Sequence, residues 1–256
     1  MTDEQLLRYA RHLMLPSWGV HCQERVLASH ALVIGAGGLG SAALLYLASA
    51  GVGTITVVDD DVVELSNLQR QIAHTTARIG QAKVHSAQQA LQAINPDVTV
   101  VAHQARATAD NLPQWVAQNS VVLDCSDNFA TRQAINAACV RGEKPLVWAS
   151  ALGLHGQLAV YDPRETKSPC YACVFPPSSA PPEVACATMG VWAPLVGIMG
   201  SAQAAEALKL LAGLDSARCD RLLIFDAQHM QWQDMRTMPT PSCTICGGAP
   251  PAISQA

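Results

Sequence analysis

The stretch ALVIGAGGLG, from Ala31 to Gly40, joins a short apolar run to a cluster of glycines. Gly35, Gly37 and Gly40 match the pattern G-x-G-x-x-G, between a predicted strand and a predicted helix. Glycine lets the backbone approach a phosphate, and the free N–H groups at a helix N-terminus attract an anion. Asp59 ends the next predicted strand, where a carboxylate can accept hydrogen bonds from ribose hydroxyls. This context favours a nucleotide site over a tight turn without a ligand.

Apolar, β-branched runs alternate with helical patterns over the first 150 residues, and no P-loop pattern occurs among them. We predict strands at 31–34, 54–58, 98–102, 121–124 and 145–149, and helices at 3–13, 39–50, 84–94, 112–118 and 131–141. Such alternation favours a mostly parallel sheet with helices on both faces.

The pattern changes after residue 149. Two further strands are predicted at 156–161 and 221–226, with a proline-rich loop at 168–182 and a helix at 197–211 between them. The predicted fold class is therefore α/β, with a Rossmann-like, mostly parallel sheet extended by antiparallel strands. We expect a single domain over residues 1–248, divided into an N-terminal helical part (1–30), a nucleotide-binding half (31–150) and a second half (151–248), and a flexible tail at 249–256.

Composition narrows the class of protein. The chain has 256 residues, with 16 basic and 20 acidic side chains and no basic block, so nucleic-acid binding has little electrostatic support. Nine cysteines, an odd number in a chain of this length, fit a reducing cytoplasm better than a disulfide framework. The N-terminus has no signal-peptide pattern. Residues 184–205 carry no charge, but their glycines, proline and polar groups favour a buried loop and helix over a membrane span.

Four of the cysteines form two matched pairs, Cys170-x-x-Cys173 and Cys243-x-x-Cys246. This spacing is typical of a tetracysteine zinc site, in which all four positions are filled and the role is structural. The alternative is two unrelated redox pairs, which we consider the weaker interpretation.

A polar segment follows the second predicted strand. Residues 66–71 have the sequence SNLQRQ, in which Arg70 offers a planar set of donors suited to phosphate, and Lys83 follows as a second cation. Asp127 and Asn128 come just after another strand, at the edge where open α/β sheets bind ligands. A carboxylate at that edge could hold Mg²⁺ against phosphates. Each residue alone is equally compatible with a solvated loop or a helix cap.

Taken together, these motifs resemble the ThiF/MoeB/HesA family, bacterial relatives of the ubiquitin-activating enzymes. The resemblance covers nearly the whole chain and is carried by residues 35–40, 50–53, 65–71 and 124–128 and by the paired cysteines. It implies an enzyme that uses ATP to adenylate the C-terminal glycine of a small ubiquitin-like sulfur carrier, ThiS- or MoaD-like, with release of pyrophosphate. A thiocarboxylate would then form for thiamine thiazole or molybdopterin synthesis, and a cysteine desulfurase or rhodanese could donate the persulfide.

The resemblance also implies roles for individual residues. Asp59 would hold the ribose, Arg70 and Lys83 the phosphates, and Asp127 the Mg²⁺. Arg11 would reach the nucleotide of the neighbouring subunit, which implies a homodimer, and Cys186 would bond covalently to the carrier. The remaining residues assigned to the nucleotide site are Gly35, Gly37, Gly38, Gly40, Ser66, Asn67, Gln69 and Asn128. The alternative function, from another class of enzyme, is that of an NAD-dependent oxidoreductase with a structural zinc.

Overall fold

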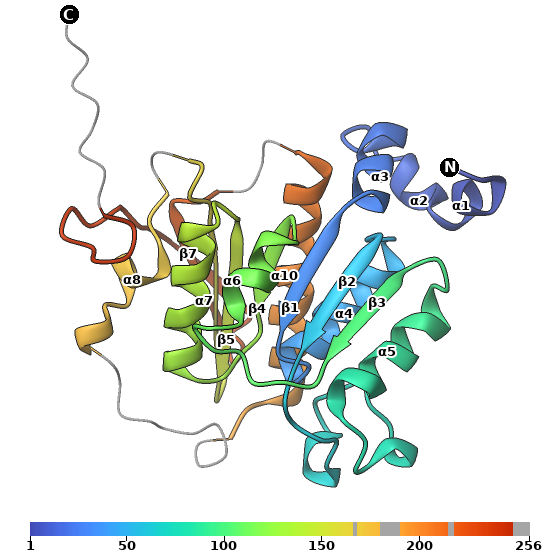
Figure 1. The fold of residues 1–256 in the computed structure, drawn as a ribbon, viewed down its shortest axis with the longest axis horizontal. Coiled ribbons are helices and arrows are strands. Elements are labelled where there is room, and N and C mark those ends of the chain that lie inside the picture. Colours follow the sequence, from blue (N-terminus) through green and yellow to red (C-terminus); the bar gives the residue numbers. More distant parts are fainter. Residues whose placement is uncertain (166–167, 180–189, 215–217, 248–256) are drawn as a thin grey trace, which may run out of the picture.

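The computed structural model describes residues 1–165, 168–179, 190–214 and 218–247. Its framework is an eight-stranded sheet in the order β3-β2-β1-β4-β5-β6-β7-β8 (Figure 1). The strands are β1 (His30–Ile34), β2 (Thr54–Val58), β3 (Thr99–His103), β4 (Val121–Asp124), β5 (Leu146–Leu152), β6 (His155–Tyr161), β7 (Arg221–Asp226) and β8 (Gln231–Arg236).

The first five strands run parallel, and β6, β7 and β8 extend the sheet in antiparallel pairs. From β1 the chain moves outward through β2 to β3, then crosses back to β4 on the other side of β1. This reversal makes the boundary between β1 and β4 the topological switch point, where the connections leave a crevice at the carboxyl ends of the strands.

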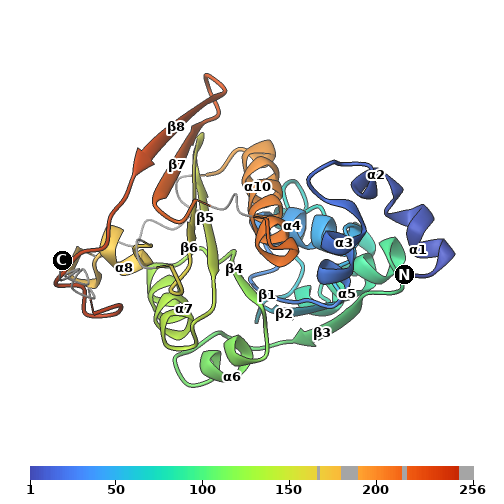
Figure 2. The ribbon, with the colours of Figure 1, turned by 90° about the horizontal axis from the view of Figure 1, so that it is seen from above.

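Helices cover both faces of the sheet, as predicted (Figure 2). One face carries α3 (Gly19–Leu27), α4 (Gly38–Ser49), α5 (Lys83–Ile94) and α10 (Ala193–Ala212), and the other carries α6 (Leu112–Ala117), α7 (Phe129–Arg141) and α8 (Tyr171–Val174). Strand β1 shows why: Ala31 and Val33 pack into the first core, whereas Leu32 and Ile34 pack into the second. A strand buried on both faces is apolar throughout, which is the pattern that predicted it.

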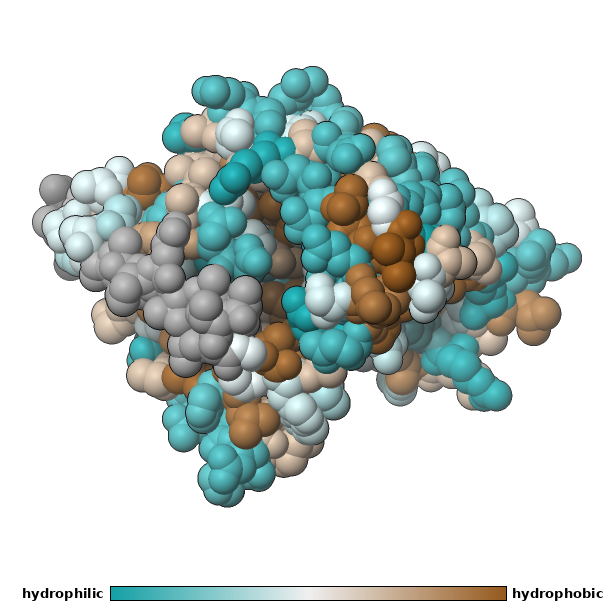
Figure 3. Space-filling view, turned by 90° about the horizontal axis from the view of Figure 1, so that it is seen from below, coloured by the Kyte–Doolittle hydropathy of each residue, from teal (hydrophilic) through white to brown (hydrophobic). Residues whose placement is uncertain are grey.

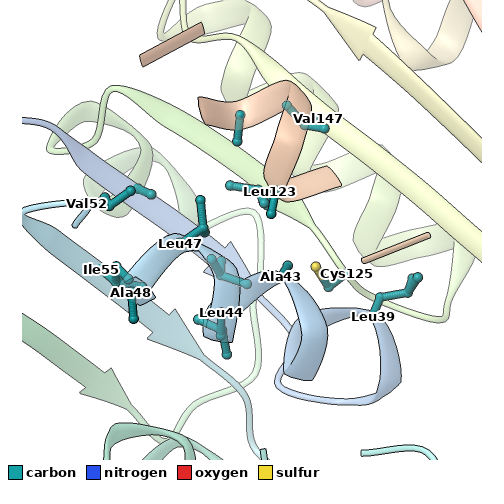
Figure 4. Close-up of a cluster of buried hydrophobic side chains, with 14 of the residues drawn as sticks. Leu39, Ala43, Leu44, Leu47, Ala48, Val52, Ile55, Leu123, Cys125 and Val147 are labelled. Carbon is teal, nitrogen blue, oxygen red and sulfur yellow. The ribbon is translucent and has the colours of Figure 1, made fainter. Parts of the chain in front are cut away.

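Small residues bring α4 close to its neighbours. Leu44 and Leu47 of α4 point toward the sheet, where Ile55 and Leu123 are also buried (Figure 4). A Cβ atom on Gly200 of α10 would lie 2.2 Å from the Leu39 carbonyl oxygen of α4, so the two helices touch through their backbones. The glycine turn at the start of α4 is therefore anchored on a rigid, closely packed pair of helices.

Helix α10 begins at Ala193, four residues earlier than predicted, because Pro194 lies in its first turn, where the missing N–H costs nothing. By length and composition it could cross a membrane, but half of its most apolar window is buried against the rest of the protein. It packs along α4 and against β4, β5 and β6. From Ala193 onward the 184–205 segment is thus a core helix, as predicted, whereas residues 190–192 precede it as a non-helical stretch.

Other predictions of local structure were wrong. The single N-terminal helix is divided into α1 (Asp3–Arg8) and α2 (Ala10–Leu13), because Tyr9 leaves helical geometry and turns its ring into the core. Helix α3 and strand β8 were missed, and every residue of β8 is exposed, so no apolar alternation marks it. Three short 3₁₀ helices complete the described structure: η1 (Leu65–Asn67), η2 (Thr76–Arg78) and η3 (Pro177–Ser179). The predicted flexible tail lies outside the described residues.

Candidate functional site

A cavity of about 370 Å³ opens at the switch point, beyond the carboxyl ends of β1, β2 and β4. Its size falls in the usual range for small-molecule sites, roughly 300–1,000 Å³. Figure 3 looks onto this end of the molecule and shows the hollow near its centre. The predicted site residues that line it are Gly35, Gly37, Gly38, Asp59, Arg70, Lys83, Asp127 and Asn128.

The glycine turn forms one wall of the cavity, and its glycines have different roles. Gly35 has a φ of +97°, and a Cβ there would lie 2.7 Å from the Cys125 carbonyl oxygen. A Cβ on Gly40 would lie 1.9 Å from the Gly35 carbonyl oxygen, so Gly40 permits the turn to close but does not line the cavity. Gly37 is the N-cap of α4 and no side chain caps this helix, which leaves N–H groups free for an anion.

Asp59 stabilises that turn. Its Oδ2 accepts a hydrogen bond from the Ala36 N–H (2.7 Å), and its Oδ1 accepts one from the Asp61 N–H (2.8 Å). Burial raises the pKa of Asp59, an effect opposed by the charge of Lys83 and by the two backbone hydrogen bonds. A carboxylate oxygen can accept more than one hydrogen bond, so the predicted contact with a ribose is compatible with these bonds.

Two predicted cations face the cavity. Lys83 is the first residue of α5 and is 5% exposed, and its Nζ lies 2.7 Å from Asp61 Oδ2. Arg70 Nη1 donates to the Ser66 carbonyl oxygen (3.2 Å), which leaves other guanidinium donors for a ligand. A buried ammonium beside a negative ligand is a strong electrostatic element, because little water screens it.

Asp127 and Asn128 follow β4 on the opposite side of the cavity. Asp127 is exposed and accepts no hydrogen bond within the described residues, so it is available to a cation. Asn128 is the N-cap of α7, where its Oδ1 accepts from the Thr131 N–H (2.9 Å). The structure thus assigns Asn128 the capping alternative, although it remains at the cavity edge.

Several predicted site residues lie elsewhere. Ser66, Asn67 and Gln69 belong to the same surface segment as Arg70 but do not line the cavity. Arg11 is exposed on α2, also away from the cavity of its own chain. Cys186 lies outside the described residues.

The structure also adds residues that the sequence analysis did not assign to the site. Gln71, Arg106, Ser126 and Arg132 line the cavity, and the buried Oε1 of Gln71 has no hydrogen-bond partner among the described residues. Gln71 ends the SNLQRQ run, so the motif itself could have indicated it. The guanidinium of Arg132 lies 5.4 Å from the centre of the Trp148 ring and donates to the Ser126 carbonyl oxygen (2.9 Å). No sequence pattern predicts these contacts.

The four paired cysteines meet at the far end of the second half, and their ligand atoms all lie within 4.8 Å of one another. The sulfur–sulfur distances are 3.8 Å for Cys170–Cys173, 3.6 Å for Cys170–Cys243 and 3.5 Å for Cys173–Cys246. A tetrahedral zinc with bonds of about 2.3 Å requires about 3.8 Å between sulfurs, so the residues fit this metal. The hydrogen bond between Cys170 and Cys173 lowers the pKa of the Cys173 thiol and raises that of Cys170, so the two thiols share a proton that a bound metal would displace.

Comparisons with known proteins agree with this architecture. The chain is 46% identical over 249 residues to the sulfur carrier protein ThiS adenylyltransferase of Escherichia coli K12, covering 97% of this chain and 98% of that protein. It is 41% identical over 250 residues to the molybdopterin-synthase adenylyltransferase of Salmonella typhimurium LT2, covering 96% and 98%.

Among solved structures, E. coli MccB with MccA-N7isoASN has a TM-score of 0.83 at 20% identity, covering 96% of this chain and 75% of MccB, and so shares the fold. The model of the ThiF family matches residues 9–245. Together with the two close relatives, this match over almost the whole chain shows that the protein belongs to the ThiF family.

Proposed function

We propose that this protein is an adenylyltransferase that uses ATP to activate the C-terminal glycine of a small ubiquitin-like sulfur carrier. The observation that carries the proposal is the cavity, where the uncapped N-terminus of α4 meets the predicted cations Arg70 and Lys83 and a carboxylate, Asp127, that accepts no hydrogen bond among the described residues. The names of both close relatives support it, since each is an adenylyltransferase. Nothing in these comparisons supports the NAD-dependent alternative.

The cavity suggests how ATP would be oriented. The N–H groups of Gly37 and Gly38 at the start of α4 would bind phosphate oxygens, and Asp59 would accept hydrogen bonds from the ribose. Lys83 begins α5, and Arg70 lies in the segment between β2 and α5. Both line the cavity, so this segment and helix supply positive charge along one wall. Asp127 faces this wall from the end of β4, where it would hold Mg²⁺.

In the reaction, an oxygen of the carrier's terminal carboxylate attacks the α-phosphorus of ATP. A new P–O bond forms, the bond to the bridging oxygen between the α- and β-phosphates breaks, and pyrophosphate leaves with those electrons. Two negatively charged reactants must approach one another, so Arg70 and Lys83 would offset their repulsion and stabilise the charge on the leaving group. Mg²⁺, when bound, neutralises further phosphate charge.

A homodimer would complete this site through Arg11. Exposed apolar side chains gather on the N-terminal helices and the turns beside them: Leu7 (78% exposed), Met14 (72%), Leu15 (48%) and Val20 (50%). The segment between β2 and α5 exposes four more, Val62, Leu65, Ile72 and Ile79, and Figure 3 shows apolar surface beside the hollow. A second copy that covered these surfaces could bring its Arg11 to the cavity.

Zinc would be held by Cys170, Cys173, Cys243 and Cys246, where it supplies a cross-link without an open position for substrate. Cys186 would act after adenylation, when sulfur from a persulfide donor replaces AMP on the carrier. Which pathway the thiocarboxylate serves, thiamine or molybdopterin, depends on which carrier the protein accepts.

The decisive experiment is ATP–pyrophosphate exchange with a panel of purified carriers that end in Gly-Gly. We expect exchange that requires ATP, Mg²⁺ and one of the carriers, and no exchange with the same carrier lacking its last glycine. Failure of zinc-loaded protein to exchange with any carrier would reject the proposal. A change in nicotinamide absorbance with a small substrate would favour the oxidoreductase instead.

A further inference from the structure

The backbone of Ala36, in the middle of the glycine turn, is held at both of its peptide groups. Its N–H donates to Asp59, and its carbonyl oxygen lies 2.8 Å from Nε2 of His74. His74 is 6% exposed and does not line the cavity, so the reaction described above makes no use of it.

The hydrogen bonds assign the tautomer of this imidazole. A carbonyl oxygen only accepts, so Nε2 of His74 must carry the proton that joins it to Ala36. In the neutral ring, which burial favours by lowering the pKa of His74, Nδ1 then has a free lone pair, and it lies 2.9 Å from the hydroxyl oxygen of Ser86, which donates to it. Ser86 is fully buried, so water does not compete for this bond. The result is a chain of hydrogen bonds from Ser86 through His74 to Ala36.

Helix α5 anchors this chain of hydrogen bonds. Ser86 lies three residues after Lys83, and residues at that spacing share one side of a helix. Arg78 strengthens the connection, because its Nη1 donates to the carbonyl oxygens of Ser86 (2.9 Å) and Ala73 (3.2 Å). The helix that carries the buried cation therefore also supports the glycine turn.

Planarity of the peptide bond transmits the effect of His74 to the cavity. The Ala36 carbonyl and the Gly37 N–H belong to one trans peptide and point in opposite directions. When His74 holds the carbonyl, the Gly37 N–H is directed the other way. That N–H donates to no acceptor within the described residues, and Gly37 lines the cavity.

We propose that His74 is a positioning residue whose neutral, Nε2-protonated imidazole orients the Ala36–Gly37 peptide so that the Gly37 N–H meets a nucleotide phosphate. The inference rests on the proposed function only for the identity of the nucleotide. Burial lowers the pKa of His74, which favours the neutral form, and the charged groups near it are Asp59, Lys83 and Arg78. His74 itself touches no substrate.

Binding of Mg·ATP by calorimetry, in parallel with thermal unfolding, tests this role. His74→Leu removes the donor and should weaken ATP binding about tenfold, the size expected for one hydrogen bond to the backbone. His74→Gln keeps an N–H that can reach Ala36 and should restore most of the affinity. Equal affinity in His74→Leu and the wild type, or no rescue by His74→Gln, would overturn the proposal.

Asn95 provides a matched control at the other end of α5. It is fully buried, and its Nδ2 donates to the Tyr9 hydroxyl and the Ala48 carbonyl oxygen, both 2.9 Å away. Asn95→Ala should lower the unfolding temperature and leave the ATP dissociation constant unchanged. An equal loss of ATP affinity in Asn95→Ala would show that any buried defect has this effect, which contradicts a specific role for His74.

Two further measurements cover the remaining outcomes. If His74→Leu does not fold, Ser86→Ala removes the donor to Nδ1 and should weaken ATP binding about threefold; unchanged binding would count against the proposal.

Nitrogen NMR of histidine-labelled protein should show His74 neutral, with its proton on Nε2, and a proton on Nδ1 alone would overturn the proposal. A wild-type protein that binds no ATP would reject the proposed function and this proposal together, whereas ATP binding that His74→Leu does not weaken rejects this proposal alone.

Discussion

The candidate nucleotide site lies mainly within residues 31–150, here the nucleotide half, and the cysteine cluster lies within residues 151–248, here the zinc half; the two sites are built in opposite ways. In the nucleotide half, the site consists of backbone N–H groups and side chains at the carboxyl ends of adjacent parallel strands, so folding the sheet assembles it. In the zinc half, Cys170 and Cys243 are 73 residues apart and belong to segments outside any strand. The first site follows from the sheet, whereas the second brings together two segments that are distant in the chain and that the proposed zinc would join.

Helix α7 lies between the two sites and contacts both. Its N-cap, Asn128, is at the cavity edge, and further along it Asn136 Oδ1 accepts from the Tyr171 N–H (2.8 Å), beside the cysteines. Gln133 Nε2 also donates to the Phe175 carbonyl oxygen (2.7 Å). Because α7 contacts both sites, variants at one site can show whether the other site loses stability with it.

The largest expected effect is loss of the metal. Cys243→Ser should abolish zinc binding and lower the free energy of unfolding by several kcal/mol, since a structural zinc contributes directly to folding. Hydrogen exchange should show lost protection around residues 170–175 and 240–246 but retained protection in β1, β2 and α4. Cys22→Ser, at a half-buried cysteine outside the cluster, should change neither zinc content nor exchange. Simultaneous loss of protection in both halves would contradict their independence.

The next largest effect concerns Asp127, the cavity carboxylate that accepts no hydrogen bond among the described residues. Asp127→Asn should reduce ATP–pyrophosphate exchange about 100-fold, because the negative charge that would hold Mg²⁺ is gone. Zinc content and unfolding temperature should not change, since Asp127 is exposed and accepts no hydrogen bond in the described structure. Asp110→Asn, at another exposed aspartate, serves as the control and should retain full activity. Zinc loss in Asp127→Asn would instead indicate misfolding.

Two glycines of the turn allow a finer test within the nucleotide half. Gly40→Ala should cost roughly 1–3 kcal/mol of stability, because its Cβ would lie 1.9 Å from a backbone oxygen that cannot move aside. At Gly37 the nearest atom to an added Cβ, Gln71 Nε2, is 3.7 Å away. Gly37→Ala should therefore fold with nearly unchanged stability and bind ATP less tightly. Chemical denaturation and calorimetry separate the two outcomes, and equal destabilisation would contradict this division of roles.

The smallest expected effect is a dependence of stability on pH. Because burial lowers the folded-state pKa of His74 below 6.5, the unfolded state binds more protons between those two values. The free energy of unfolding should be constant above pH 6.5 with respect to this group and should fall as the pH drops toward the folded-state pKa. His74→Gln removes this titrating group. The free energy of unfolding of the variant should therefore fall less than that of the wild type between pH 7.5 and 5.5, by about 1 kcal/mol or less. An identical pH profile would show that His74 does not titrate in this range.

Much of the fold could be predicted because its strands are buried on both faces. Strands β1 and β4 are short apolar runs and β2 is a β-branched run, and each ends at a glycine or an acidic residue, a pattern with few alternatives. Strand β8 could not be found in this way: its six residues are all exposed, and only pairing with β7 makes it a strand. The break between α1 and α2 has a similar origin, since Tyr9 packs against Gly51 and bonds to Asn95, both distant in sequence.

The same distinction between local sequence and tertiary packing decides which residues of the candidate site could be assigned from the sequence. Residues in local motifs, such as Gly37 and Asp59, were assigned to the cavity from sequence and lie there. Ser66 and Gln69 belong to the same motif as Arg70 but do not line the cavity, because the motif's fold directs them to the surface. Arg132 and Arg106 were missed, since each reaches the cavity only through the position of its element at the sheet edge.

The sequence by itself determined the class of the fold, the glycine turn, the two C-x-x-C pairs and the family resemblance, because each can be recognised from short motifs whose residues are close together in the chain. The tertiary structure decided which polar residues meet. It brought His74 to the carbonyl of Ala36, 38 residues away, and it left Asp127 without a hydrogen-bond partner among the described residues. Local spacing governs backbone conformation, whereas the partner of a buried polar group depends on how the elements pack, and that information is spread over the whole chain.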